Sequence, residues 1–315
     1  MKTSLKPAAI VAAALIALSA CKKNNDKPAF VRAEEILAKN AIPTQTFTGD
    51  ATAGFTIVGE KGTKIVFPPK ALQGGDGQPV SGTVTITLKE VLSKKDVMFS
   101  GVMTESNGSI LESGGELLVK AQKDGKDLGI MPDSAIKVEV PKVMNDQDMG
   151  LFVLGERKRD QNGGDQQPLQ NPNTWLPAPY APFGNGPNSY SFNLPAFTWV
   201  NCDRFYSDPG PKTTITVSPV FADNNQVNDL QVMLVFRDIQ TVITLPFSTS
   251  LNKFESYWNS LPVGLQADLV IIGKDSDGYL QFGTQLITIS ANQHINASIH
   301  RATQSEVDAF LATVN

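Results

Sequence analysis

The sequence predicts an all-β protein built from two antiparallel β-sandwich-like domains, joined by a segment rich in proline and aromatic residues and ending in a short C-terminal helix. Three observations predict this fold class. Apolar and polar residues alternate with a period of two through much of the chain from residue 51 onward. Glycine and proline are frequent, at 25 and 20 of 315 residues, and turn sequences such as residues 74–77 (GGDG) separate the alternating runs. Helical spacing of apolar residues is confined to short segments.

The strands predicted for the first domain are short, with one apolar and one polar face. Val84, Ile86 and Leu88 alternate with threonine, so this strand buries one side and leaves the other wet. Similar runs predict further strands at residues 55–58, 63–67, 117–121 and 136–140.

In the second domain, residues 230–236 and 269–272 are almost continuously apolar, which predicts central strands. Ile215 and Val217 alternate with threonine and predict a further strand. Alternating residues between 287 and 299 predict a closing hairpin.

Three short helices are expected. Residues 30–40 have near-helical spacing, and Thr303-Gln-Ser-Glu306 is a capping box that predicts a terminal helix over residues 304–313. A third helix is predicted between Ser248 or Ser250 and Pro262, because its apolar residues recur at intervals of three and four. These apolar residues are Leu251, Phe254, Trp258 and Leu261.

The segment between the two domains differs in composition from the rest of the chain. Residues 168–195 contain seven prolines, and residues 175–206 contain nine of the aromatic side chains. Proline makes this segment stiff and predicts few strands. Its aromatic residues either pack between the two sandwiches, which is the interpretation we favour, or form a ligand-binding surface. The candidate ligand-binding residues are Trp175, Tyr180, Phe183 and Tyr190.

The first 21 residues have the order of a bacterial lipoprotein signal. Lys2 and Lys6 precede an apolar run at residues 8–18, and Leu18-Ser-Ala-Cys21 matches a lipobox. We expect cleavage before Cys21 and attachment of acyl chains such as palmitate, since two or more chains give stable anchoring. The alternatives are an ordinary secretory signal or a core helix, and the run is too short to span a bilayer permanently. The expected location is the bacterial outer membrane, with the periplasmic and surface faces both open.

Part of the first domain resembles a known family. Residues 62–72 read GTKIVFPPKAL, which is similar to the pattern G-x-x-(apolar)-x-I-P-P-G-A-(I/L) of the β-sandwich shared by zonula occludens proteins, netrin receptors and ankyrins. Residues 84–88 and 136–141 resemble later strands of that sandwich, and Lys70 stands where the family has glycine. The resemblance covers residues 51–142 and implies a sandwich that binds protein, with no enzyme activity to carry over. Residues 113–116 and 197–205 further resemble Bacteroidetes lipoproteins.

The sequence contains no complete catalytic or metal-binding motif. His294 and His300 would lie about 20 Å apart on one strand, so they cannot share a metal. Cys202 has no histidine near it in sequence and is expected to be a small buried residue, while the neighbouring Asp203 and Arg204 are expected to form a structural ion pair. Residues 275–278 (DSDG) lack the further ligands of an EF-hand and predict a hairpin turn. We therefore expect no metal and no cofactor.

These observations leave three functions open. A formal net charge of −4 without a basic patch argues against a nucleic-acid partner. The leading hypothesis is a non-catalytic protein-interaction or scaffold module of the cell envelope, held to the membrane by its lipid and bound to an envelope protein. The second is a surface glycan-binding lipoprotein, and the third a hydrolase with paired carboxylates. The predicted division of the chain is a signal peptide (1–20), a tether with a short helix (21–50), a first sandwich (51–148), a connecting segment (149–211) and a second sandwich-like domain (212–315).

Overall fold

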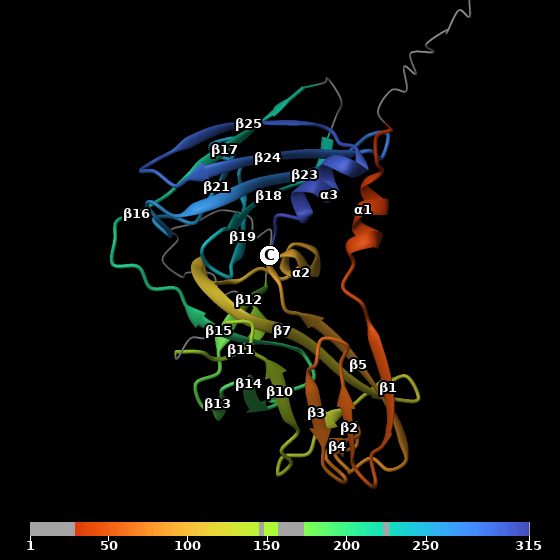
Figure 1. Cartoon of the computed structure of the whole chain (residues 1–315). Coiled ribbons are helices and arrows are strands. Elements are labelled where there is room, and N and C mark those ends of the chain that lie inside the picture. The colour runs from red at the N-terminus through yellow and green to blue at the C-terminus, as the bar shows by residue number, and fades with distance from the viewer. Residues whose placement is uncertain (1–28, 145–147, 157–172, 223–226, 315) are drawn as a thin grey trace, which may run out of the picture.

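The computed structural model describes residues 29–144, 148–156, 173–222 and 227–314, so the predicted signal peptide, Cys21 and the start of the tether lie outside the described residues. Strands dominate and three short helices accompany them, which confirms the predicted all-β class. The strands form two lobes stacked end to end (Figure 1). We call residues 41–205 the N-terminal lobe and residues 206–314, together with 29–40, the C-terminal lobe.

The N-terminal lobe is a sandwich of two antiparallel sheets. The order of the first sheet is β1-β5-β7-β15-β11-β12, and that of the second is β13-β14-β10-β3-β2. The first contains β1 (Gln45–Asp50), β5 (Thr83–Val91), β7 (Ser109–Lys123), β15 (Trp199–Phe205), β11 (Gly150–Glu156) and β12 (Asn173–Pro177), with β6 (Glu105–Ser106) and β8 (Lys126–Asp127) paired to β7. The second contains β13 (Phe183–Asn185), β14 (Ser189–Asn193), β10 (Lys137–Pro141), β3 (Lys64–Phe67) and β2 (Phe55–Val58), and a separate pair joins β4 (Leu72–Gln73) to β9 (Gly129–Ile130).

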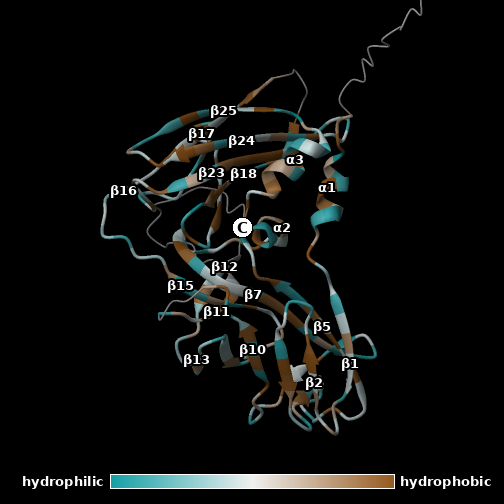
Figure 2. Ribbon diagram, in the orientation of Figure 1, coloured by the Kyte–Doolittle hydropathy of each residue, from teal (hydrophilic) through white to brown (hydrophobic). Residues whose placement is uncertain are grey.

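The core of this lobe lies between the two sheets. Ile86 and Leu117 of the first sheet pack in one apolar cluster with Ile65 and Val138 of the second, and all four side chains are fully buried. Figure 2 shows the apolar colour of β10 in this layer. The period-two pattern therefore predicted the buried faces of these strands correctly.

The prediction that residues 149–211 form a strand-poor connection was wrong. This segment supplies β11 to β15, and β15 pairs with the long strand β7 while β14 pairs with β10. The N-terminal lobe thus extends well beyond the predicted boundary at residue 148. Proline is accommodated because β12 lies at the edge of its sheet, where a missing ladder N–H costs little.

In the C-terminal lobe a single sheet bends into two layers. Its order is β19-β18-β23-β24-β25-β17-β21-β20, and β24 pairs with β25 only at Gln281 and Phe282 before the strands diverge. The strands are β17 (Thr216–Phe221), β18 (Val227–Phe236), β19 (Val242–Leu245), β20 (Phe247–Ser248), β21 (Lys253–Glu255), β23 (Gln266–Asp275), β24 (Leu280–Thr288) and β25 (His294–Arg301), with a separate pair of β16 (Lys212–Thr213) and β22 (Leu261–Pro262). Central β18 and β23 are buried on both faces, which explains their continuous apolar runs.

The helix predicted between residues 248 and 262 is absent from the structure. The segment instead forms β20, β21 and β22 with turns between them. Asn252 and Asn259 adopt left-handed backbone angles, with φ of 52° and 51°, which interrupt any helix. Phe254 and Leu261 are buried, whereas Leu251 and Trp258 are exposed, so the four residues do not share one face.

The other two predicted helices are confirmed as α1 (Ala33–Asn40) and α3 (Gln304–Leu311), and the predicted capping box of Thr303 and Glu306 starts α3. A further helix, α2 (Lys94–Ser100), begins with a capping box of Ser93 and Asp96. Although α1 is early in the chain, it lies on the C-terminal lobe (Figure 1), where Phe30 bridges to Thr303 and Arg32 to Tyr279.

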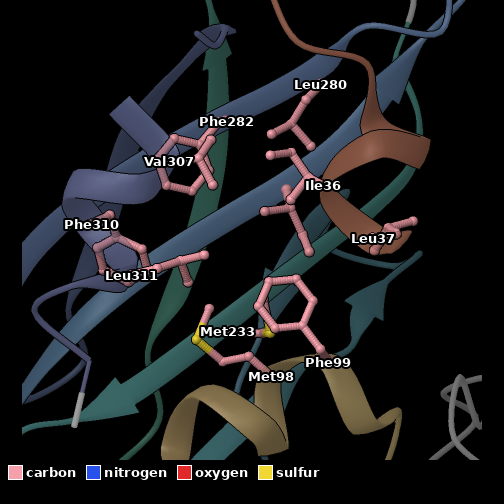
Figure 3. A pocket seen from close by; sticks show the side chains of 11 residues that line it. Ile36, Leu37, Met98, Phe99, Met233, Leu280, Phe282, Val307, Phe310 and Leu311 are labelled. Atoms are coloured by element: carbon pink, nitrogen blue, oxygen red, sulfur yellow. The ribbon is translucent and has the colours of Figure 1, made fainter. Parts of the chain in front are cut away.

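The three helices meet over β18, β23 and β24 and seal the junction between the lobes. Figure 3 shows side chains of α1, α2 and α3 pointing toward one another, among them Ile36, Phe99 and Leu311. The cavity left between them measures about 20 Å³ and is lined only by apolar side chains. A site this small without polar partners has no means of holding a ligand or an ordered water, so we regard it as part of the core.

Polar contacts also tie the lobes together. The Lys94 ammonium donates to the backbone oxygen of Phe236 at 2.7 Å. Thr241 Oγ1 donates to the backbone oxygen of Leu111, also at 2.7 Å, and Thr104 exchanges hydrogen bonds with Val242.

None of the helices in the described ranges is long and apolar enough to cross a membrane.

One turn of the N-terminal lobe carries backbone strain. Lys70 adopts a left-handed conformation with φ of 59°, and its N–H donates to the backbone oxygen of Ala51 at 2.8 Å. Because glycine enters this region without a Cβ penalty, we expect Lys70→Gly to raise the free energy of unfolding by about 1 kcal/mol, measured by urea denaturation. Lys120→Gly, in the interior of β7, is the matched control and is expected to lower it. A loss of stability in both variants would contradict the assignment of strain to Lys70.

Candidate functional site

The four aromatic residues predicted as a ligand surface do not lie together on a surface. Trp175 and Tyr190 are fully buried, Phe183 is half-buried, and Tyr180 is 98% exposed. Tyr190 and Phe183 belong to the core of the N-terminal sandwich. Trp175 packs with Phe152 and Leu111 in a smaller cluster of the same lobe, so the aromatic residues are not packed between two sandwiches as we expected.

A pocket of about 420 Å³ lies instead beside the connection from β15 to β16. We call it the junction pocket, because both lobes and the chain between them contribute to it. Three segments line it: the turn between β6 and β7, the connection after β15, and the loop between β21 and β22. Its lining residues are Asn107, Gly108, Ser109, Ile110, Phe205, Tyr206, Ser207, Lys212, Tyr257, Trp258, Asn259, Ser260 and Pro262.

The first wall is a two-residue hairpin turn. Asn107 and Gly108 both have positive φ, 49° and 84°, as a type I′ turn requires, and they join Ser106 to its partner Ser109. The N–H of Asn107 donates to Thr174 Oγ1 at 2.8 Å, which holds the turn against β12. A Cβ at Gly108 would lie 2.8 Å from Cγ of Tyr257, so only glycine lets the loop of the C-terminal lobe pack this closely.

The second wall is the loop that carries Trp258. Ser260 Oγ donates to the backbone oxygen of Tyr257 at 2.8 Å, and the Asn259 N–H donates to Thr214 Oγ1 at 2.8 Å. These bonds fix the backbone on both sides of Trp258, while its side chain remains 83% exposed. A large aromatic side chain is thus presented to solvent from a turn held by hydrogen bonds.

The third wall is the connection between the lobes. Phe205, at the end of β15, is 46% exposed, whereas Tyr206 packs against the core of the C-terminal lobe. Burial, followed by the charges of Asp208 and Glu112, raises the pKa of the Tyr206 hydroxyl, so it stays protonated at neutral pH. Lys212 is the one charged residue among the described residues that line the junction pocket.

The pocket also offers polar groups that the fold leaves unused. Within the described part of the chain, no residue forms a hydrogen bond with the side-chain amide of Asn107 or of Asn259. Each amide carries donors and an acceptor, and both residues are exposed. Aromatic faces, amides and hydroxyls are chemically complementary to a polar ligand that also has an apolar face.

A pair of buried acids lies elsewhere, inside the N-terminal lobe. Burial, followed by the charges of Asp203 and Asp96, raises the pKa of Glu116 well above its ordinary value. Burial likewise raises the pKa of Asp203, whose Oδ2 accepts a 2.6 Å hydrogen bond from Asn201. Neither carboxyl oxygen of Glu116 has a hydrogen-bond partner among the described residues.

These two acids do not share an open pocket. Asp203 borders a hollow of about 290 Å³ together with Asp148 and Arg204, but Glu116 is not part of its lining. Glu116 has no exposed surface, and the register pairs it with Asn201 across β7 and β15. The arrangement lacks the substrate access that a pair of hydrolytic carboxylates needs.

The remaining sequence candidates have structural roles. Cys202 is buried in the sandwich core, as expected, and burial raises the pKa of its thiol well above the ordinary value. The described ion pair of Arg204 is with Glu112, rather than with Asp203 as predicted, because neighbouring strand residues point to opposite faces. Residues 275–278 form the β23–β24 hairpin turn, confirming that prediction.

The histidines lie toward solvent on β25. His294 contacts Thr216 Oγ1 at 2.8 Å, and His300 contacts Glu306 at 3.3 Å. In the part of the chain that the structure describes, no three metal-ligating side chains come together.

No protein-family model, no curated protein and no solved structure matches this chain.

The sequence did contain signals for the junction pocket. Asn107-Gly108 is a strong hairpin-turn dipeptide, and Tyr257-Trp258-Asn259-Ser260 places aromatic residues beside small polar ones. Because apolar residues recur at intervals of three and four, Trp258 was predicted to lie on a helix face. The turn pattern of residues 257–260 was therefore not recognised. The meeting of the two segments could not be predicted, because it depends on how the lobes pack.

Proposed function

We propose that this protein is a lipid-anchored lipoprotein of the bacterial outer membrane that acts as a non-catalytic binding or scaffold module of the cell envelope. The observation that carries the anchor is Leu18-Ser-Ala-Cys21 after a basic start and an apolar run. Acylation of Cys21 and of the new amino terminus would hold the folded lobes at the membrane.

The junction pocket supports binding as its mode of action. Its described lining residues provide aromatic faces, amides, hydroxyls and one lysine, and no carboxylate or histidine is among them. Such a set recognises shape, hydrogen bonds and apolar faces, and it offers no paired acid and base to a substrate. The resemblance of residues 51–142 to a protein-binding sandwich points in the same direction.

The anchor has a direct test. We expect Cys21→Ser to leave the precursor uncleaved and to move the protein out of the outer-membrane fraction, because the serine hydroxyl cannot accept the lipid from the transferase. Fractionation, gel mobility and labelling with a palmitate analogue measure the three consequences. Ser19→Ala, a small-residue change within the lipobox, is the control and should be processed normally. Membrane retention and lipid labelling of Cys21→Ser would contradict the proposed anchor.

The role in binding is tested by cross-linking in intact cells. A photoreactive residue at Ser207, at the edge of the junction pocket, should give discrete adducts with envelope components. The same residue at Lys120, on the exposed side of β7, is the control position. Identical adduct patterns at the two positions would argue against a dedicated binding face.

A further inference from the structure

We propose that the junction pocket binds a carbohydrate, with Trp258 as the platform for a sugar ring and the amides of Asn107 and Asn259 as partners for its hydroxyls. This inference rests on the proposed binding role and names the ligand class of its site. It transfers the glycan-binding hypothesis from the buried aromatic residues of β12 and β14 to a different set of residues.

Two aromatic side chains of the junction pocket are exposed to solvent. Trp258 is 83% exposed and Phe205 is 46% exposed, and both line the same hollow. Single exposed aromatic residues are common on protein surfaces, but two that line one hollow form an apolar patch of the kind that marks a binding site. A pyranose ring has one face of C–H groups that stacks on an aromatic plane, while its hydroxyls stay at the rim in contact with polar groups.

Polar side chains surround these aromatic faces. The amides of Asn107 and Asn259 have no partner among the described residues, and a side-chain amide can donate to one hydroxyl and accept from the next. Ser207 adds an exposed hydroxyl to the lining. Alternating donors and acceptors around an apolar face match a sugar better than they match an apolar ligand.

The charge and the size of the junction pocket also favour a sugar. With Lys212 as the one charged group among the described lining residues, the pocket lacks the cluster of basic side chains that would hold a nucleotide's phosphates. Its volume of about 420 Å³ falls within the usual range for small-molecule sites and suits a short stretch of a glycan.

Hydrogen bonds and close packing hold the walls of the junction pocket in place without a ligand. The backbone around Trp258 is fixed by bonds from Ser260 and Asn259, and the facing turn is fixed by Thr174. The close packing of Tyr257 on Gly108 sets the separation of the two walls. Binding therefore costs little ordering of the protein, which favours recognition of a weakly interacting ligand such as a sugar.

The test is binding of the purified full-length chain, in detergent, to a glycan microarray with two arms. One arm carries the bacterium's own envelope polysaccharides and glycan chains of peptidoglycan, and the other carries plant, host and microbial storage polysaccharides. We expect binding to a restricted set of saccharides in one arm, which identifies the source of the ligand. The dissociation constant for the best ligand is then measured by affinity gel electrophoresis.

Variants connect that binding to the pocket. Trp258→Ala should weaken binding roughly tenfold or more, which is the effect of removing one aromatic side chain that stacks on a nucleic-acid base. Trp258→Phe should recover part of the affinity. Asn107→Gly removes one amide but keeps the positive φ of the turn, and should also weaken binding. Tyr180→Ala removes a fully exposed aromatic residue outside the pocket and should leave binding unchanged.

Two outcomes would overturn the proposal. One is a chain that binds no saccharide in either arm, and the other is saccharide binding that Trp258→Ala and Asn107→Gly leave unchanged. If the chain binds no saccharide but still fractionates with the outer membrane and cross-links from Ser207 to an envelope protein, the carbohydrate inference fails while the proposed function stands. If the chain binds a saccharide but neither fractionates with the outer membrane nor cross-links from Ser207, the proposed function fails while the carbohydrate inference stands.

Discussion

Replacing Trp175 with alanine is expected to lower the free energy of unfolding by about 3–5 kcal/mol, the usual range for removing a large buried aromatic side chain. Trp175 has no exposed surface and packs with Val102, Leu111 and Phe152. Its indole N–H donates to the backbone oxygen of Met103 at 2.9 Å. Alanine would leave a cavity and remove one of the two hydrogen bonds that the Met103 carbonyl accepts, the other being from the Glu105 N–H at 2.9 Å, and each loss carries a cost.

Tyr180 provides a matched control, because it is five residues further along and is 98% exposed. We expect Tyr180→Ala to change stability by no more than about 0.5 kcal/mol. Urea unfolding of both variants, followed by far-ultraviolet circular dichroism, makes the comparison. Similar losses in the two variants would contradict the assignment of Trp175 to the core and of Tyr180 to the surface.

The second large effect concerns Glu116, whose replacement by leucine should stabilise the protein at neutral and alkaline pH. Burial raises the pKa of its carboxyl above the ordinary value of 4.5, so the folded protein retains a proton that the unfolded chain loses. The stability contributed by this proton is complete below pH 4.5 and is lost as the pH rises through the raised pKa. Removing a buried group with no hydrogen-bond partner among the described residues is expected to gain about 1–3 kcal/mol at pH 8.

Glu90 is the control with the opposite sign. It is equally buried, and burial alone would raise its pKa, but hydrogen bonds from Gln45, Thr63 and Lys61 outweigh burial and hold the pKa below the ordinary value. Its contribution is therefore present above pH 4.5 and is lost as the pH falls. Glu90→Leu would leave three donors without their acceptor, and we expect a loss of at least about 2 kcal/mol at pH 8.

Urea denaturation between pH 4 and pH 9 measures both variants. In Glu116→Leu the free energy of unfolding should fall less steeply with rising pH than in the unmodified protein. Part of the fall should remain, because burial also raises the pKa of Asp203. An unchanged pH profile in Glu116→Leu would show that this carboxyl is not protonated in the folded protein.

The strands whose pattern is set by burial were predictable from sequence. Ile86 and Leu88 alternate with polar residues because β5 has one buried face, and β18 is continuously apolar in its second half because it is buried on both. The order of apolar and polar residues in a strand reflects which of its faces are buried, so the local pattern was sufficient to predict these strands.

Two errors arose where the local pattern had more than one solution. Spacing of three and four placed Phe254 and Trp258 on a helix face, but left-handed asparagines turn the chain between short strands. Tyr190 and Phe192 alternate with serine in β14, which is a strand signal that the neighbouring prolines concealed. A third feature, helix α2, was not predicted, although Ser93 and Asp96 have the spacing of a capping box and so predict a helix start there.

The position of α1 on the C-terminal lobe has a consequence for how the chain folds. The ion pair of Lys39 with Asp308 joins residues 269 positions apart, and the bridge of Phe30 with Thr303 spans a similar separation. Contacts this distant in sequence close a very large loop, which slows folding. Residues 30–40 therefore meet their partners on the C-terminal lobe only after nearly the whole chain has been synthesised. Until α1 docks, the part of the apolar face of β18 and β23 that it covers in the folded protein remains exposed, which makes incomplete chains prone to aggregation.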